Sequence, residues 1–251
     1  MMSIVNLNIS TMKTHVHHLS KNMKILVSDF DYTFFTLDYL SNIEAVQKFV
    51  NDENIFIIAT SRCKRELLED ITDFYVPYFF LICDNGAIIY NRKHEIMKKI
   101  EMDINDSKDI FNKLYKSKNI NETYKYIDDF PSTDDNEKTT KIVAKYKDYD
   151  KAEKELNKIL EENSNITGNI TESWISIVNK TATKGSAIEF ICEKYKFNKD
   201  DVYVIGDNYN DISMFEKYKG YAIKESPEEL INKSIGVVET FHEVLEKINE
   251  A

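Results

Sequence analysis

Two aspartates stand one residue apart near the start of the chain, at Asp29 and Asp31, where residues 28–33 read SDFDYT. They directly follow the apolar run at residues 24–28, which is typical of a strand buried on both faces. Open α/β sheets form their sites at the C-terminal ends of strands. Two carboxylates this close repel each other unless a cation lies between them, and Mg²⁺ takes oxygen ligands. The pair is therefore a candidate magnesium site.

Two polar motifs follow the next two apolar runs. Thr60 and Arg62 come after residues 54–59. A hydroxyl there can bond a phosphate oxygen and an arginine can pair with an anion, although a hydroxyl also suits a helix N-cap. Asn85 follows residues 79–83 and precedes Gly86, a pair that is first of all a turn signal. Taken alone, neither motif assigns a function.

Lys184 and the loop at residues 206–211 complete the set. Lys184 stands at the start of a predicted helix, where the helix dipole prefers anions, so its position favours a separate task such as neutralising phosphate. The loop reads GDNYND and follows the apolar run at 201–205, which brings Asp207, Asn210 and Asp211 to the sheet edge. An acidic surface loop is the alternative, but surface loops seldom follow such a strand so directly.

The elements that must position these residues alternate between strands and helices. Strands are predicted at 24–28, 54–59, 79–83 and 201–205, and helices at 37–50, 62–72, 185–195 and 211–217. This alternation implies parallel strands joined by right-handed crossovers. We therefore predict an α/β fold with a Rossmann-like parallel sheet and helices on both of its faces.

The middle of the chain follows a different pattern. Residues 139–147 alternate as in a half-exposed antiparallel strand, 152–160 form an amphipathic helix, and 174–178 form another strand. We predict an inserted α+β domain at 88–180, which splits the parallel domain into 23–87 and 181–251. Residues 1–22 show no sustained period, and we expect a flexible N-terminal tail there.

The composition excludes several classes of protein. The chain has 251 residues, 42% of them hydrophobic, which is enough to bury a core. Its formal net charge of −10 disfavours nucleic acid as a partner. No apolar run approaches the roughly 20 residues of a membrane helix. The three cysteines include no CxxC pair, so they suggest neither a zinc site nor a disulfide framework. We expect a cytoplasmic protein without a membrane partner, either a monomer or a weak homodimer.

The five motifs, in this order, resemble those of the haloacid dehalogenase superfamily of phosphohydrolases, specifically its Cof-type sugar-phosphatase branch. The resemblance runs throughout residues 24–90 and 180–251, whereas the middle matches only in position and approximate size. It implies that the insert is a cap over the catalytic core. It also implies Mg²⁺-dependent hydrolysis of a small phosphorylated metabolite, such as a sugar phosphate, through an aspartyl-phosphate intermediate.

The resemblance also implies catalytic roles for the matching positions. Asp29 would be the nucleophile, and Asp31 would act first as general acid and then as general base. Thr60 and Lys184 would hold the transferring phosphoryl group. Phosphoryl transfer depends mainly on positioning and charge neutralisation, which this set of side chains can supply.

The ligands of Mg²⁺ and of the substrate are implied in the same way. The metal would be bound by Asp29, Asp207 and Asp31, the last through its backbone carbonyl. Asp211 is grouped with them, because it would orient Lys184 or a metal-bound water. Three more side chains are candidates for binding the substrate or supporting the site: Arg62, Asn85 and Asn210.

Two segments depart from the pattern of the branch. Ser61 stands where the branch usually has glycine, and residues 224–226 read KES where it commonly has GNA, so no role is carried onto them. A phosphomutase of the same superfamily and a non-catalytic phosphometabolite-binding protein remain alternatives. Non-catalytic members of this superfamily usually lack the nucleophile or the carboxylates that bind the metal, and both are present here. Specificity would depend on the cap, where candidates are Tyr124, Tyr126, Lys141 and Trp174.

Overall fold

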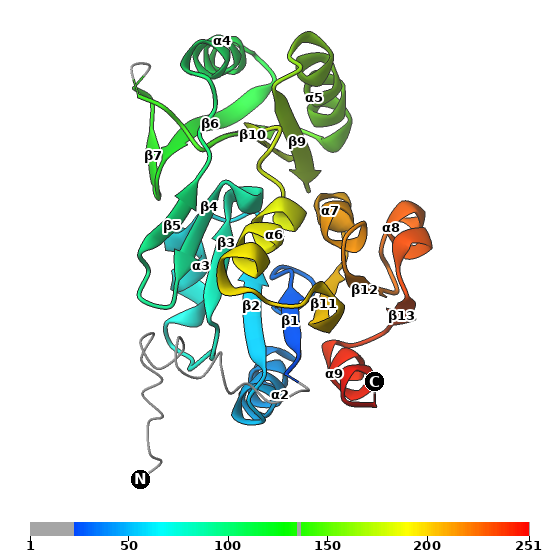
Figure 1. Ribbon diagram of the computed structural model, residues 1–251. Helices are drawn as coiled ribbons and strands as arrows, with labels where there is room; N and C mark the ends of the chain where they lie inside the picture. Colours follow the sequence, from blue (N-terminus) through cyan, green and yellow to red (C-terminus); the bar gives the residue numbers. More distant parts are fainter. Residues whose placement is uncertain (1–22, 135–136, 251) are drawn as a thin grey trace.

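A computed structural model describes residues 23–134 and 137–250, so the tail predicted at 1–22 lies outside the described residues. Its larger sheet has eight strands (Figure 1). In order across the sheet they are β13 (Gly236–Val238), β12 (Lys219–Ile223), β11 (Val202–Gly206), β1 (Ile25–Ser28), β2 (Ile55–Ala59), β3 (Phe80–Cys83), β4 (Ile88–Asn91) and β5 (Ile96–Lys99).

The six strands from β13 to β3 run parallel. Ser28, the last residue of β1, is paired with Ile205 of β11 on one side and with Ile58 of β2 on the other. The chain therefore leaves β1, β2 and β11 at one edge of the sheet, and the motifs that follow these strands emerge together. This pairing confirms the predicted parallel sheet.

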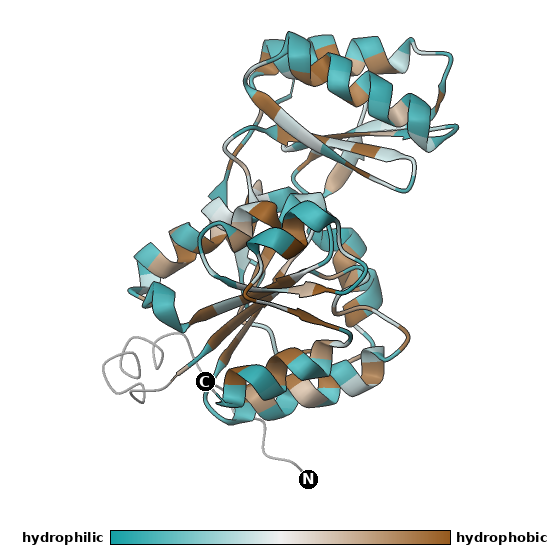
Figure 2. Ribbon diagram, turned by 90° about the vertical axis from the view of Figure 1, so that its right-hand side faces the viewer, coloured by the Kyte–Doolittle hydropathy of each residue, from teal (hydrophilic) through white to brown (hydrophobic). Residues whose placement is uncertain are grey.

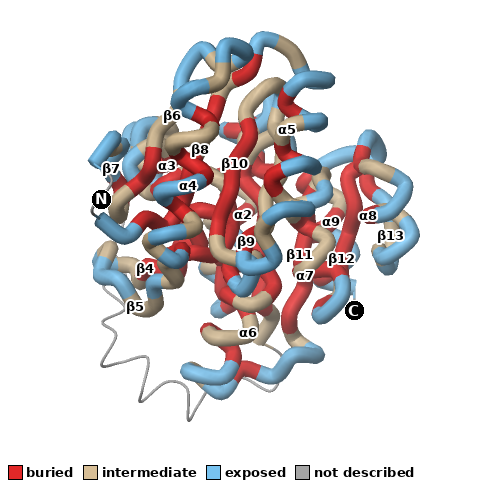
Figure 3. The backbone as a smooth tube through the Cα atoms, turned by 90° about the horizontal axis from the view of Figure 1, so that it is seen from above, coloured by how far each residue is buried: buried red, intermediate tan, exposed pale blue. Residues whose placement is uncertain are grey.

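Helices cover both faces of this sheet, as predicted. One face packs against α2 (Tyr39–Asn51), α3 (Lys64–Ile71) and α9 (Phe241–Glu250), and the other against α6 (Lys184–Tyr195), α7 (Ile212–Phe215) and α8 (Glu228–Lys233). The strands between them are hydrophobic along their length (Figure 2) and buried, whereas the outer turns are exposed (Figure 3). Burial on both faces explains why the strands read as continuous apolar runs.

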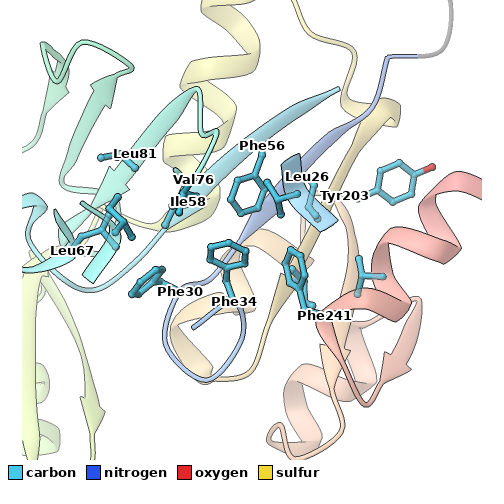
Figure 4. Close-up of a cluster of buried hydrophobic side chains, with 14 of the residues drawn as sticks. Leu26, Phe30, Phe34, Phe56, Ile58, Leu67, Val76, Leu81, Tyr203 and Phe241 are labelled. Carbon is cyan, nitrogen blue, oxygen red and sulfur yellow. The ribbon is translucent and has the colours of Figure 1, made fainter. Parts of the chain in front are cut away.

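An aromatic cluster fixes the loop that follows β1. Phe30 lies between the two aspartates in the sequence, and its side chain is fully buried in the apolar core between the larger sheet and helices α2, α3 and α9 (Figure 4). Its ring stacks on Phe35 with the centroids 5.1 Å apart, and Phe34 packs against Phe56 and Phe241. Residues 30–35 are thus anchored below the sheet edge, which holds the two flanking carboxylates in place.

The insert begins later than the predicted residue 88. A turn at η1 (Asp84–Gly86) reverses the chain, so β4 pairs antiparallel with β3, and β5 pairs with β4. Residues 88–90 are buried in the larger sheet. The sequence assigned this apolar run to the insert because it follows a turn signal. Strand pairing instead assigns residues 88–99 to the core.

The smaller sheet is antiparallel and lies over the C-terminal edge of the larger one (Figure 1). Its strands, in order, are β7 (Phe130–Ser132), β6 (Ile120–Ile127), β8 (Lys141–Tyr146), β10 (Trp174–Asn179) and β9 (Ile166–Thr171). Helices α4 (Ile104–Tyr115) and α5 (Tyr149–Glu162) pack on its outer face around a separate apolar cluster. We call residues 100–180 the cap. Within the described part of the chain, no helix is long and apolar enough to cross a membrane.

Candidate active site

A buried lysine joins two aspartates at the edge of the larger sheet. Asp29 follows β1, and its backbone N–H donates to the carbonyl of Ile205 at 3.0 Å. Lys184 Nζ lies 2.5 Å from Asp29 Oδ1 and 2.6 Å from Asp211 Oδ1. The side chains of Lys184 and Asp211 are inaccessible to solvent, and that of Asp29 nearly so. The first residue of α6 is therefore the counter-ion of two motifs that follow different strands.

Asp207 completes a cluster of three carboxylates. Ligand oxygens of Asp29, Asp207 and Asp211 all lie within 4.8 Å of one another. Thr33 donates from its hydroxyl to Asp207 Oδ1 at 3.1 Å. Asp211 Oδ2 accepts from the backbone N–H groups of Asp207 and Asn208, at 3.0 and 3.1 Å. Asp211 thus holds the loop with one oxygen and the lysine with the other, which leaves Asp29 and Asp207 as the better placed metal ligands.

The electrostatics of the cluster favour a bound cation. Burial raises the pKa of Asp29 well above its ordinary value, and although Lys184 opposes this shift, the neighbouring carboxylates add to it. Burial, and then Asp211, raise the pKa of Asp207 to about 6. Burial alone would lower the pKa of Lys184, but Asp211 and Asp29 outweigh it, so the pKa is raised and the amine stays protonated. One lysine does not neutralise three carboxylates, and a hard divalent cation with oxygen ligands fits this donor set.

Two glycines allow these groups to approach one another. A Cβ on Gly206 would lie 2.4 Å from Asp211 Oδ2, so a side chain there would displace the carboxylate that holds the loop. Gly86 has a φ of +103°, and a Cβ on it would lie 2.3 Å from the carbonyl oxygen of Thr183, next to Lys184. The turn after β3 and the start of α6 can therefore touch only when residue 86 is glycine.

Asp31 lies outside the carboxylate cluster. Its Oδ2 accepts from Arg62 Nε at 2.9 Å, and its Oδ1 accepts from Arg62 Nη2 at 2.5 Å. Arg62 also pairs with Asp70, and its guanidinium lies over the ring of Phe30, 5.2 Å from the centroid. The side chain of Asp31 is 28% exposed, so it faces the mouth of the site. The side chain of Asp31 thus pairs with Arg62, so any metal ligand from this residue would be its backbone carbonyl, as the resemblance implies.

Thr60 and Asn85 join two of the loops. The backbone N–H of Asn85 donates to the carbonyl of Thr60 at 3.0 Å. The hydroxyl of Thr60 is buried and accepts from the backbone N–H of Arg62 at 3.1 Å, so its own proton is available for a further acceptor. Asn85 adopts a φ of 55°, a left-handed conformation that asparagine tolerates. Asn210 Nδ2 donates to Asn85 Oδ1 at 3.0 Å, which ties this turn to the loop that carries Asp207.

Three groups at the site were not predicted from the sequence. Thr33 ends the first motif, and its spacing from Asp29 could have suggested a role. Asn169 lies in the cap and accepts at Oδ1 from Asn85 Nδ2 at 2.8 Å, but no motif surrounds it. Asp84 is fully buried and pairs with Lys141 of the cap at 2.8 Å. Lys141 was expected among the specificity residues, whereas its amine is held by the core.

A cleft of about 490 Å³ lies beside these groups, between the cap and the core. On the core side it is lined by Asn85, Tyr209 and Asn210, together with residues of α7. On the cap side it is lined by residues of α5 and by residues 167–170 of β9. A cleft lined by both apolar and polar side chains thus lies next to the amides beside the carboxylate cluster.

Comparison with known proteins identifies the family. A model of the haloacid dehalogenase-like hydrolase family matches residues 26–130 and 115–244. An uncharacterized protein of Mycoplasma capricolum is 28% identical over 271 residues, and the match covers 88% of this chain and 98% of that protein. A phosphoglycolate phosphatase of Thermoplasma volcanium is 43% identical over 44 residues, which cover 18% of this chain and 19% of that one.

Solved structures share the whole architecture. A subclass IIB sugar phosphatase, BT4131, superposes with a TM-score of 0.76 at 18% identity, covering 91% of this chain and 98% of the other. At this identity the likeness concerns the fold, including the predicted cap. Together with the family model, which spans most of the described residues, it confirms the predicted family and fold class. The chain belongs to the haloacid dehalogenase-like hydrolases.

Proposed function

We propose that the protein is a Mg²⁺-dependent phosphatase that hydrolyses a small phosphorylated metabolite through an aspartyl-phosphate at Asp29. The observation that carries the proposal is the buried arrangement of Asp29, Lys184, Asp207 and Asp211. A carboxylate that is held by a buried amine and lies next to a second carboxylate suits a nucleophile at a metal-assisted phosphoryl-transfer site.

In the first step, a carboxylate oxygen of Asp29 attacks phosphorus, and the bond from phosphorus to the leaving oxygen breaks. Asp31, in its protonated form, gives its proton to the leaving alcohol. Lys184 and the hydroxyl of Thr60 hold the phosphoryl oxygens. Asp29, Asp207 and the backbone carbonyl of Asp31 would hold Mg²⁺, which supplies positive charge where the negative charges of nucleophile and phosphate meet.

In the second step, Asp31 accepts a proton from water, whose oxygen attacks phosphorus and releases phosphate and Asp29. The ion pair with Arg62 fixes the orientation of the unprotonated Asp31 carboxylate, which is the form that accepts the proton from water. From the sequence, Arg62 was predicted as a candidate for binding the substrate. Since Asp31 and Asp70 already occupy its guanidinium, we propose that it orients the general acid and base.

The substrate class we propose is a sugar phosphate. The cleft beside the site presents an amide from Asn157 and a hydroxyl group from Tyr209, which suit the hydroxyl groups of a leaving sugar. The relatives point to two chemistries, since one is named a sugar phosphatase and another a phosphoglycolate phosphatase. A panel that compares sugar phosphates with phosphoglycolate separates them.

Phosphate release from p-nitrophenyl phosphate, measured with and without Mg²⁺, tests the proposed reaction. We expect turnover by the wild type with Mg²⁺, and none by Asp29→Asn, whose amide cannot attack phosphorus. Asp52→Asn, at an exposed aspartate after α2, is the matched control and should retain wild-type rates. Equal rates for wild type and Asp29→Asn, with both proteins folded by circular dichroism, would reject the assignment.

A further inference from the structure

The cap is attached to the core firmly on the side of β6 and β8. Lys141 pairs with the fully buried Asp84 at 2.8 Å, and Thr140 donates to the same carboxylate at 3.1 Å. Asp129 of the cap accepts from the hydroxyl of Tyr90 at 2.9 Å and pairs with Lys64 at 2.8 Å. If the cap opened on the side of β6 and β8, these contacts would break, and each would leave a buried charged or polar group unpaired.

The opposite side of the cap, along β9, is attached more loosely. Asn169 accepts from Asn85 at 2.8 Å, and the exposed Glu172 accepts from the hydroxyl of Tyr32 at 3.2 Å. The cleft of about 490 Å³ separates the rest of this strand from α7. An outward movement of β9 would therefore break few contacts: the hydrogen bond of Glu172 reaches the loop after β1, and that of Asn169 reaches the turn after β3 and, through it, the loop after β11.

A chain of three amides runs from Asn169 into the site. Asn169 accepts from Asn85, and Asn85 in turn accepts from Asn210 at 3.0 Å. Asn210 lies in the loop between Asp207 and Asp211, and the backbone N–H of Asn85 also donates to the carbonyl of Thr60. Asn85 is thus the point where the cap, the loop after β2 and the loop after β11 meet.

The orientation of β9 directs Asn169 toward the core. A Cβ on the neighbouring Gly168 would lie 2.8 Å from the side chain of Leu156 in α5, so position 168 faces the apolar side of the cap. Side chains alternate along a strand, and Thr167 and Asn169 therefore face the opposite way. Thr167 lines the same cleft, but among the described residues its hydroxyl makes no hydrogen bond to the core.

We propose that Asn169 is a positioning residue that couples closure of the cap to the order of the catalytic loops through Asn85 and Asn210. The inference rests on the proposed phosphatase function. When β9 lies against the core, the amide chain fixes the turn after β3 and the loop that carries Asp207. When β9 moves away, Asn85 loses one of its two side-chain partners and the loops relax.

The first test compares Asn169→Ala with Thr167→Ala as the matched control. Removal of one neutral hydrogen bond should lower kcat for p-nitrophenyl phosphate by about 3- to 10-fold. The KM of this small substrate should change less, because Asn169 acts on the loops rather than on the phosphoryl group. Thr167→Ala should leave both constants unchanged. Equal effects of the two variants would overturn the proposal.

The second test asks whether Asn169 acts through Asn85. Asn85→Gly tolerates the same left-handed backbone and has no side-chain amide for Asn169 to contact. In this background, Asn169→Ala should cause no further loss of kcat. The same 3- to 10-fold loss in both backgrounds would show that Asn169 acts independently of Asn85 and would refute the coupling.

Amide hydrogen exchange of residues 206–211 gives a readout that does not depend on activity. Exchange there should be faster in Asn169→Ala than in wild type or Thr167→Ala, because the loop has lost its link to the cap. If Asn169→Ala showed the same exchange and the same kcat as wild type, the proposed coupling would be overturned, whereas the proposed phosphatase function would stand. If the wild type hydrolysed no phosphate ester while the exchange difference persisted, the proposed function would fail and the coupling would stand.

Discussion

Replacement of Lys141 by methionine removes the cation from a buried ion pair between cap and core. The side chain of Lys141 is 3% exposed, and its Nζ lies 2.8 Å from Asp84 Oδ1 and 3.0 Å from the carbonyl oxygen of Ser61. It also lies 4.4 Å from the centroid of the Tyr126 ring. Methionine has a similar length and fills the space, so the main effect of Lys141→Met is to leave the fully buried Asp84 without a counter-ion.

The expected destabilisation follows from this loss. Removing one partner of a buried ion pair costs about 3–5 kcal/mol, and in a chain of this size each kcal/mol lowers the Tm by about 2–4 °C. We therefore expect the Tm of Lys141→Met to fall by about 6–20 °C. Asp84→Asn removes the orphaned charge and tolerates the φ of 50° at this position. Combined with Lys141→Met, it should recover most of the loss.

The loss of stability in Lys141→Met should also depend on pH. Burial raises the pKa of Asp84 above its ordinary value even though Lys141 opposes the shift, and removing Lys141 should raise it further. A carboxyl group whose pKa is higher in the folded than in the unfolded state contributes stability at low pH that is lost as the pH rises. The difference in Tm between wild type and Lys141→Met should therefore be smaller at pH 5 than at pH 8.

Thermal unfolding followed by circular dichroism at the two pH values measures both effects. Lys145→Met is the control, because Lys145 lies on the same face of β8 and its amine contacts the ring of Trp174. This control should shift the Tm by no more than about 2 °C, since substitutions away from buried networks usually change stability by less than about 0.5 kcal/mol. If Lys141→Met shifted the Tm as little as the control, or equally at both pH values, the unpaired Asp84 charge would not be the source of the cost.

Four further predictions concern the site itself. Asp31→Asn should lower kcat/KM, which reports the first step, by about 10²–10⁴-fold for alkyl phosphates and by less for p-nitrophenyl phosphate, and a loss of kcat/KM independent of leaving-group pKa would exclude the acid role. Gly206→Ala should abolish turnover, since its Cβ would displace Asp211; wild-type kcat in a folded variant would contradict this geometry. Dialysis against EDTA should abolish activity, Mg²⁺ should restore it and Ca²⁺ should inhibit it, because its looser coordination spoils in-line attack; full activity after dialysis would argue against a metal. A protein with residues 101–179 replaced by a short Gly/Ser linker should remain folded and hydrolyse p-nitrophenyl phosphate, but lose discrimination among larger substrates; retained preferences would show that the cap does not set specificity.

The fold of the core could be predicted because its strands are buried on both faces. Short continuous apolar runs such as 24–28 and 201–205 are typical of such strands, and the helices between them imply parallel pairing. The start of the insert was predicted wrongly, because β4 and β5 follow a turn signal and pair antiparallel. Local patterns do not show which sheet an extra hairpin joins.

The cap was harder to predict than the core, and neither strand β6 nor helix α4 was among the predicted elements. Residues 120–127 form β6, yet they read INETYKYI, in which polar side chains interrupt the apolar alternation. Tyr126 is buried against the core, where its hydroxyl donates to Glu66, whereas Lys125 is buried on the opposite face, with its amine over the ring of Phe111 in α4. A strand that places polar groups against another domain lacks the alternation by which strands are recognised in a sequence.

At the site, the sequence predicted which residues gather but not how they pair. Motifs at strand ends must meet at one sheet edge, so Asp29 and Asp207 could be grouped in advance, whereas Lys184, at the start of a helix, was grouped with them through the family resemblance. The ion pair of Arg62 with Asp31, and the hydrogen bond of Asn169 to Asn85, depend on side-chain orientation and on the docking of the cap. No local pattern records these contacts.

Trapping the proposed covalent intermediate would test the mechanism more directly than any rate. The Asp31→Asn variant, which lacks the general base, should accumulate phosphorylated Asp29 when mixed with p-nitrophenyl phosphate and Mg²⁺. Borohydride reduces an acyl phosphate to an alcohol, which would convert Asp29 to homoserine, and mass spectrometry of the peptide containing residues 25–31 locates the change. We expect substrate-dependent homoserine at position 29. Reduction at another residue, or none during demonstrated turnover, would contradict an aspartyl-phosphate at Asp29.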